Sequence, residues 1–243
     1  MPSQKILVVP DSHVPFHDRK NWNLLLKVAK ELQPDQVVII GDFFDFLSVS
    51  HFPKPPGRFN LLKEEVKAGN HELDRLQDIV GDGVTYLEGN HEWRLERYLV
   101  QKAPELFGIL SCKELFRIEE RGWDWIPYHQ HLLVGKVLFA HDLGHSGKYA
   151  GFQTLAAAGQ CVVFGHTHRG GVEYDGTVDG DHRFSMNVGW LGDASKIEYT
   201  HRAKTRGWQL GFGWINMDAK GLAAAQFCPI VSGKVCVDGQ WIR

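Results

Sequence analysis

Cysteine, long apolar runs and an excess of charge of either sign are all scarce in this sequence. Four cysteines occur among 243 residues and none forms a Cys-x-x-Cys pair, which argues against a disulfide framework and indicates reduced thiols in a cytoplasmic protein. No stretch approaches 18 uninterrupted apolar residues and no basic segment precedes an apolar one at the start, so neither a membrane span nor a secretory leader is expected. The net charge of −2 provides no overall basic surface for nucleic acid.

The rest of the composition is that of an ordinary globular protein, with 43% hydrophobic and 23% charged residues. The length supports a single domain over residues 1–243, with room for a small insertion. Two stretches, at about 43–80 and 103–121, are candidates for a helical or lid insertion. Between 123 and 134, aromatic and polar residues alternate, which predicts one strand.

Five apolar runs each lead to a residue that is able to bind a metal ion. The strongest run, at 37–40, has four β-branched residues, which is typical of a strand buried on both faces of a parallel sheet, and Asp42 follows it. Because ligands bind beyond the carboxyl ends of strands in open α/β sheets, we expect these polar residues to meet at one edge. The other four runs lead to Asp11 and His13, to Asn90 and His91, to His141, and to His166 and His168.

The tetrapeptide Gly-Asn-His-Glu occurs twice, at 69–72 and at 89–92. The first copy lies inside an amphipathic helical pattern that runs from about 61 to 80, whereas the second follows an apolar run and precedes a new helix. Only the second copy is therefore able to present its side chains at the end of a strand. We expect the first copy to lie on a surface helix without a chemical role, and Glu92 of the second copy to cap the helix that follows.

Taken in order, these motifs resemble those of the calcineurin-like metallophosphoesterase superfamily. The motifs span residues 11–168, and Asn187-Val188-Gly189 resembles a late turn of the family and extends the match to about 190. The resemblance implies an α/β fold, a four-layer α/β/β/α sandwich with two mixed β-sheets, and a site for two divalent metal ions at the sheet ends. It also implies the ligands: one ion would be bound by Asp11, His13, Asp42 and His168, and the other by Asp42, Asn90, His141 and His166.

The chemistry of these residue types agrees with that arrangement. A carboxylate has two oxygens and is able to bridge two cations, as Asp42 would, whereas an imidazole is not. Two metal ions about 3.5–4 Å apart hold the attacking and leaving oxygens of an in-line displacement and lower the pKa of bound water to about 7. His91, which the resemblance places near the leaving oxygen, would donate a proton to it. A nitrogen and oxygen ligand set favours Mn²⁺, with Fe, Ni²⁺ or Zn²⁺ as alternatives.

We therefore predict a dinuclear metal-dependent phosphoesterase that uses a metal-bound hydroxide, with phosphodiesters or nucleic acids as the favoured substrates. Arg94 and the basic, aromatic stretch that contains Lys204 and Arg206 are candidate contacts for a nucleic acid or nucleotide, although this stretch equally suits a solvated loop. Asp45 either orients a metal ligand or is an exposed loop carboxylate. The alternatives are a phosphatase of small monoesters or phosphoproteins, and a non-catalytic scaffold, which should have lost ligands or His91. Eight Trp and fourteen Phe residues leave a homodimer open.

Overall fold

The fold is built on two mixed β-sheets. The computed structural model describes residues 3–51, 61–176, 178, 180–196 and 207–243. The first sheet has the strand order β11-β10-β1-β2-β3-β4; β1 to β4 are parallel, and β10 and β11 join them in antiparallel pairings. Its strands are β1 (Gln4–Val9), β2 (Gln36–Ile39), β3 (Val84–Leu87), β4 (Asp124–Ile126), β10 (Gly211–Met217) and β11 (Ala223–Pro229).

The second sheet has the strand order β5-β6-β7-β9-β8. Its three central strands are parallel, and each edge strand is antiparallel to its neighbour. A short hairpin, β12 with β13, forms a separate two-stranded unit. The strands are β5 (Leu132–Val134), β6 (Val137–Ala140), β7 (Cys161–Phe164), β8 (Gly170–Gly176), β9 (His182–Val188), β12 (Val235–Val237) and β13 (Gln240–Ile242).

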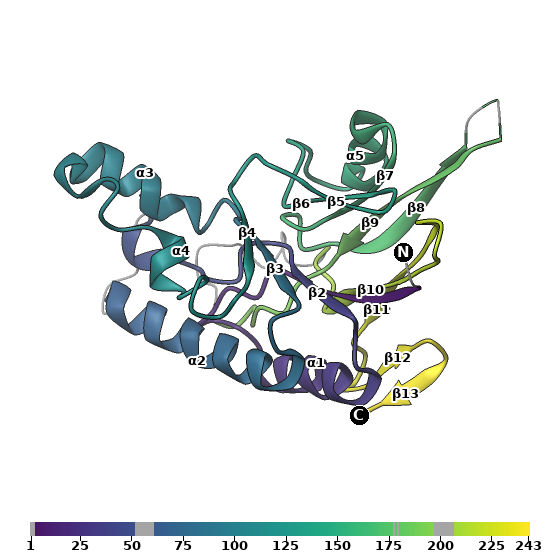
Figure 1. Ribbon diagram of the computed structural model, residues 1–243, viewed down its shortest axis with the longest axis horizontal. Helices are drawn as coiled ribbons and strands as arrows, with labels where there is room; N and C mark the ends of the chain where they lie inside the picture. The colour runs from purple at the N-terminus through teal and green to yellow at the C-terminus, as the bar shows by residue number, and fades with distance from the viewer. Residues whose placement is uncertain (1–2, 52–60, 177, 179, 197–206) are drawn as a thin grey trace.

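Helices cover the outer faces of the two sheets, as Figure 1 shows: α1 and α2 lie along the first sheet and α5 lies on the second. The predicted α/β fold with two mixed sheets is therefore confirmed. Within the described residues, no helix has both the length and the apolar character needed to cross a bilayer. The helices are α1 (Arg19–Leu32), α2 (Leu62–Val80), α3 (Trp93–Lys102), α4 (Cys112–Leu115) and α5 (Ala150–Ala158), with 3-10 turns η1 (Leu47–Val49) and η2 (Pro104–Leu106).

Burial on both faces explains the β-branched runs of the sequence. Successive side chains of a strand point to opposite faces, so Val37 and Ile39 of β2 pack under the helices. Val38, also of β2, and Ile40, which follows it, pack between the two sheets against Val163 and Met186. Each sheet therefore has one face in a common inter-sheet core, which fixes the strand ends of both sheets relative to one another.

The segment 123–134 differs from its prediction as a single strand. It is divided between β4, which pairs with β3 in the first sheet, and β5, which pairs with β6 in the second. Pro127 follows β4 and has no backbone N–H to continue the ladder, and His129 adopts a left-handed conformation with φ 66°. The alternating pattern was correct for the ends of this segment, but the turn between them carries the chain from one sheet to the other.

Candidate metal centre

Among the described residues, three overlapping groups near the carboxyl ends of the strands are able to bind a metal ion, and His13, Asp45 and His91 form one of them. The first cluster contains four buried residues: Asp11, His13, Asp42 and His168. Asp11 follows β1, Asp42 follows β2 and His168 follows β7. One ligand atom of each lies within 4.8 Å of those of the other three. The Nε2 atoms of His13 and His168 are 2.9 Å apart, and Nε2 of His168 lies 3.3 Å from Oδ2 of Asp11.

The second cluster contains Asp42, His141 and His166, and Asn90 completes it. Oδ1 of Asn90 lies 3.0 Å from Nε2 of His141 and 2.7 Å from Nδ1 of His166. Asp42 belongs to both clusters, and its Oδ1 lies 3.4 Å from Nε2 of His141. The structure thus brings together all seven predicted ligand residues around one shared carboxylate.

The backbone at this site is strained in a way that points to function. His13, Asp42, His166 and His168 all have positive φ values, between 51° and 65°. Residues other than glycine rarely adopt this left-handed conformation, and such residues gather at active and binding sites. Tight contacts between loops hold it in place: the backbone N–H of His13 donates to the carbonyl of Asp42 at 3.0 Å, and the backbone N–H of Leu191 donates to the carbonyl of Asp11 at 2.8 Å.

The donor atoms fit divalent metal ions. Apart from the His168 ring, no described residue offers a hydrogen bond to the buried Asp11 carboxylate. Nδ1 of His13 lies 3.1 Å from Oδ2 of Asp45, and Nδ1 of His141 lies 3.0 Å from the carbonyl oxygen of Ile40. Acceptors at Nδ1 hold the ring proton there and turn the Nε2 lone pair toward the cluster, which is the arrangement found behind metal-binding histidines. The buried clusters therefore suit a dinuclear metal site.

The charges of the site also favour cations. Burial alone would raise the pKa of Asp42, but the neighbouring His141 and His91 hold it well below its usual value. Burial lowers the pKa of His141, but Asp42 outweighs it and raises this pKa to about 10. Burial, assisted by the nearby His13, lowers the pKa of His168 to about 4, so this ring is neutral at pH 7. The ionised Asp42 carboxylate and the neutral His168 ring are in the protonation states that metal binding requires, whereas the His141 ring carries a proton that a metal ion would have to displace.

His91, the predicted proton donor, lies next to the shared carboxylate. Its Nε2 is 3.8 Å from Oδ2 of Asp42, and its ring meets the His13 ring edge-on at 4.5 Å between centroids. Nδ1 of His91 lies 2.9 Å from the carbonyl oxygen of Asp45, to which it donates, and Nε2 accepts from Nη2 of Arg94 at 2.8 Å. Arg94 itself is buried and also donates to the carbonyl of Asp45. Arg94, predicted to contact the substrate, therefore lies inside the site and is hydrogen-bonded to His91, the predicted proton donor.

Two acidic residues have larger roles than the sequence indicated. Asp45 is fully buried and its carboxylate contacts the His13 ring. Of the two alternatives from the sequence, the exposed loop carboxylate is therefore wrong. Glu92 stands at the N-cap position of α3, but its side chain makes no capping hydrogen bond to that helix. Its buried carboxylate instead accepts from the backbone N–H groups of Asp42 (2.9 Å), Gly89 (3.0 Å) and Phe44 (3.0 Å). The Tyr86 hydroxyl also donates to it at 2.8 Å, so one carboxylate ties the loop after β2 to the loop after β3.

The burial of Asp45 could have been predicted from its neighbours in the sequence. Phe43, Phe44 and Phe46 flank it, and large aromatic side chains are mostly buried, so the carboxylate between them is expected to be buried too. Nothing local could have shown the role of Glu92, since its partners at 42 and 44 lie far away in the chain. The two other predicted substrate contacts, Lys204 and Arg206, lie outside the described residues.

Comparison with known proteins agrees with this geometry. Residues 4–170 match the calcineurin-like phosphoesterase family. The chain is 30% identical over 257 residues to the Gene 54 protein of Mycobacterium phage L5, and 29% identical over 262 residues to the Gene 54 protein of Mycobacterium phage D29. Each alignment covers 98% of this chain and 98% of the relative.

Among solved structures, the fold is similar to that of vacuolar protein sorting 29 from Cryptosporidium parvum. The TM-score is 0.50 at 14% sequence identity, and the alignment covers 100% of this chain and 97% of the other. At this level of identity the similarity concerns the arrangement of the sheets and helices and carries nothing about activity.

Proposed function

The chain belongs to the calcineurin-like phosphoesterase family, and from that premise we propose that it hydrolyses phosphodiesters with two divalent metal ions, Mn²⁺ being the favoured metal. The observation that carries the proposal is the pair of buried clusters that share Asp42. A shared carboxylate between two sets of nitrogen and oxygen ligands is the arrangement that a two-metal hydrolase needs.

The proposed ligands are those that the clusters bring together. Asp11, His13, Asp42 and His168 bind one ion, and Asp42, Asn90, His141 and His166 bind the other. Bound there, two divalent cations supply positive charge for the phosphoryl oxygens and lower the pKa of water. Asp45 and the Ile40 carbonyl orient the rings of His13 and His141 from behind.

His91 is the proposed general acid. In this structure its Nε2 accepts from Arg94, so Nε2 has to gain a proton and lose that contact before it serves a leaving oxygen. We propose that the Arg94 guanidinium donates to a phosphate oxygen of the bound substrate in place of His91. A planar guanidinium is well suited to bind phosphate oxygens. His91 Nε2 would then take a proton from solvent and pass it to the leaving alkoxide, while Nδ1 stays hydrogen-bonded to the Asp45 carbonyl.

An aromatic group beside the second cluster supports a nucleotide or nucleic acid as the diester. The Tyr128 ring lies 6.3 Å from that of His141, 3.9 Å from that of His129 and 5.5 Å from that of Trp93. The Arg97 guanidinium lies over the Trp93 ring at 5.4 Å from its centroid. Aromatic rings and a cation next to a phosphoester site offer stacking for bases and attraction for the backbone.

The first test compares hydrolysis of bis-p-nitrophenyl phosphate with that of p-nitrophenyl phosphate, using metal-stripped protein and Mn²⁺ added back. We expect two bound metal ions per chain and faster turnover of the diester. Asp42→Asn should lose both metal binding and turnover, whereas the exposed Asp82→Asn serves as a matched control and should keep both. Preference for the monoester would make the protein a phosphatase, and failure to bind metal would overturn the proposed site.

A further inference from the structure

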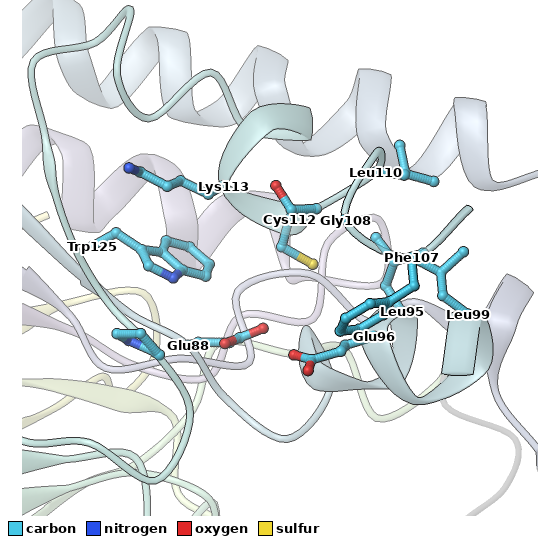
Figure 2. Close-up of a pocket in the computed structure, with 12 residues that line it drawn as sticks. Glu88, Leu95, Glu96, Leu99, Phe107, Gly108, Leu110, Cys112, Lys113 and Trp125 are labelled. Carbon is cyan, nitrogen blue, oxygen red and sulfur yellow. The ribbon is translucent and has the colours of Figure 1, made fainter. Parts of the chain in front are cut away.

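A pocket lies between α3, the η2–α4 segment and the chain around β4. It has a volume of about 340 Å³, which is within the range of small-molecule sites. Figure 2 shows the residues that line it, with the Cys112 thiol and the Trp125 ring facing the same space. Its apolar lining consists of Leu95, Leu99, Phe107, Leu110, Trp125 and Pro127.

This pocket is separate from the metal centre. The thiol of Cys112 donates to the carbonyl of Glu92, so the backbone of residue 92 forms part of the partition. On the other side of that partition, the Glu92 side chain holds the loops of the metal centre. None of the seven proposed metal ligands lines the pocket.

The polar part of the lining consists of two carboxylates, Glu88 and Glu96, together with Ser111 and Lys113. Glu88 comes directly after β3 and is only 8% exposed, and its Oε2 accepts from the backbone N–H of Tyr128 at 3.0 Å. Figure 2 shows the carboxylates of both residues on the same side of the pocket. A buried carboxylate in an apolar surrounding is costly unless a positive charge accompanies it.

No such charge comes from the described part of the chain. Neither Glu88 nor Glu96 has a cationic partner there within 4 Å, and the one cationic residue of the lining, Lys113, is engaged elsewhere. Its Nζ pairs with Oε1 of Glu119 at 2.7 Å. Burial therefore raises the pKa of Glu88 to about 7, so this carboxyl is partly protonated at pH 7 and a bound cation would favour its ionised form. The pocket thus combines apolar walls with the exposed Glu96 carboxylate and a carboxyl that a cation is able to ionise.

We propose that this pocket binds a small organic cation, an ammonium ion with an apolar body. The body would lie against Leu95, Leu99 and Trp125, and the ammonium group would be placed between the carboxylates of Glu88 and Glu96. Charge-assisted hydrogen bonds to the carboxylates and desolvation of the apolar body both favour such a ligand. A neutral ligand of the same shape gains only the second contribution, and an anion is repelled.

The test uses isothermal titration calorimetry of the full chain with 1-naphthylmethylammonium, and with 1-naphthylmethanol as its neutral counterpart. We expect the ammonium ion to bind about tenfold more tightly than the alcohol, or more. Glu96→Lys places a positive charge at an exposed position of the lining and should weaken ammonium binding about tenfold while sparing the alcohol. Glu105→Lys, an exposed substitution outside the lining, is the matched control and should leave both affinities unchanged.

Two further variants test whether the compounds bind in this pocket and whether the charge of residue 96 sets their affinity. Leu110→Trp fills the pocket and should abolish binding of both compounds. Glu96→Gln removes the charge without reversing it and should give a smaller loss than Glu96→Lys. Equal affinities of ammonium and alcohol, or no effect of Glu96→Lys, would overturn the cationic ligand. Absence of binding by both compounds, or binding that survives Leu110→Trp, would overturn the pocket itself.

Discussion

The same four residues, Gly-Asn-His-Glu, occur in two settings in this chain and have different roles in each. At 89–92 they form the turn between β3 and α3, and at 69–72 they lie in the middle of α2. In the turn, Asn90 reaches His141 and His166, while His91 lies against the Asp45 carbonyl and Asp42. The Glu92 carboxylate accepts from the backbone N–H groups of Asp42 and Gly89, so all three side chains of the turn meet at one place.

In the helix the same side chains are separated by about 100° per residue and reach unrelated partners. Asn70 donates to the carbonyl of Leu115, and His71 is exposed. Glu72, only 6% exposed, accepts from the Trp22 indole at 2.7 Å and from Arg75 at 2.6 Å. The predicted helix is confirmed, but the prediction that this copy lies on the surface is wrong for Gly69 and Glu72, which are both buried.

Both glycines are required, for reasons that differ. A Cβ on Gly89 would stand 2.3 Å from Oδ1 of Asp42, so the absence of a side chain lets the shared carboxylate approach the turn. A Cβ on Gly69 would stand 1.8 Å from the Phe44 ring, so here the absence lets the aromatic core reach the helix. The comparison teaches that a tetrapeptide acquires chemistry from its position at a strand end and not from its composition.

The two histidines should give the largest difference in activity between the two copies. His91→Asn should lower kcat for a phosphodiester by about 10²–10⁴-fold, because the proton for the leaving oxygen is lost. His71→Asn, an exposed change in the other copy, should leave kcat unchanged. Steady-state kinetics with bis-p-nitrophenyl phosphate under saturating Mn²⁺ would measure both. Equal activity of the two variants would remove His91 from the mechanism.

The two glutamates give the next largest difference. Glu92→Gln turns an amide N–H₂ toward groups that already donate, so the loop that carries Asp42 loses part of its support. Metal affinity should fall about 10–100-fold, as for other residues that orient ligands. Glu72→Gln should lower stability but leave metal affinity unchanged. Mn²⁺ titrations of the folded variants at 25 °C separate the outcomes, and equal affinities would show that Glu92 is only a structural residue.

Substitution of Gly69 tests whether the helical copy needs a glycine where it packs against the Phe44 ring. Gly69→Ala should lower the free energy of unfolding by about 1–3 kcal/mol, because the added methyl group overpacks the Phe44 ring. Activity per folded molecule should be retained, since the Phe44 ring packs on the rings of Phe43, Phe46 and Phe116. Urea unfolding of the metal-free protein would measure the loss. A stability equal to that of the parent would mean that the ring moves aside at little cost.

The parts of this site that could be predicted from the sequence are those that depend on residues close together in the chain. Five apolar runs lead to the seven proposed ligands, and parallel strands bring their carboxyl ends to one edge, so local sequence was sufficient to expect these residues at one place. Their assignment as metal ligands came from the resemblance to the family. The four donors to Glu92 come from Asp42, Phe44, Tyr86 and Gly89, and no periodicity relates residue 92 to residue 42. The turn at Pro127 was missed for a similar reason, because alternation predicts a strand but does not say to which sheet it belongs.

The smallest expected effect concerns the pH dependence of the helical copy. Burial alone would raise the pKa of Glu72, but His17, whose Nε2 lies 3.6 Å from Oε1, and the hydrogen-bonded Arg75 lower it to about 2. A carboxylate with a lowered pKa in the folded state stabilises the protein above its unfolded pKa, here about 4.5, and this stabilisation is lost as the pH falls toward 2. Glu72→Gln should therefore lower the free energy of unfolding on the order of 1 to 2 kcal/mol at pH 7, and the difference from the parent should shrink between pH 4.5 and 2. Urea unfolding at pH 7, 5, 4 and 3 gives the curve, and a difference that stayed constant over this range would show that the Glu72 charge contributes nothing beyond its shape.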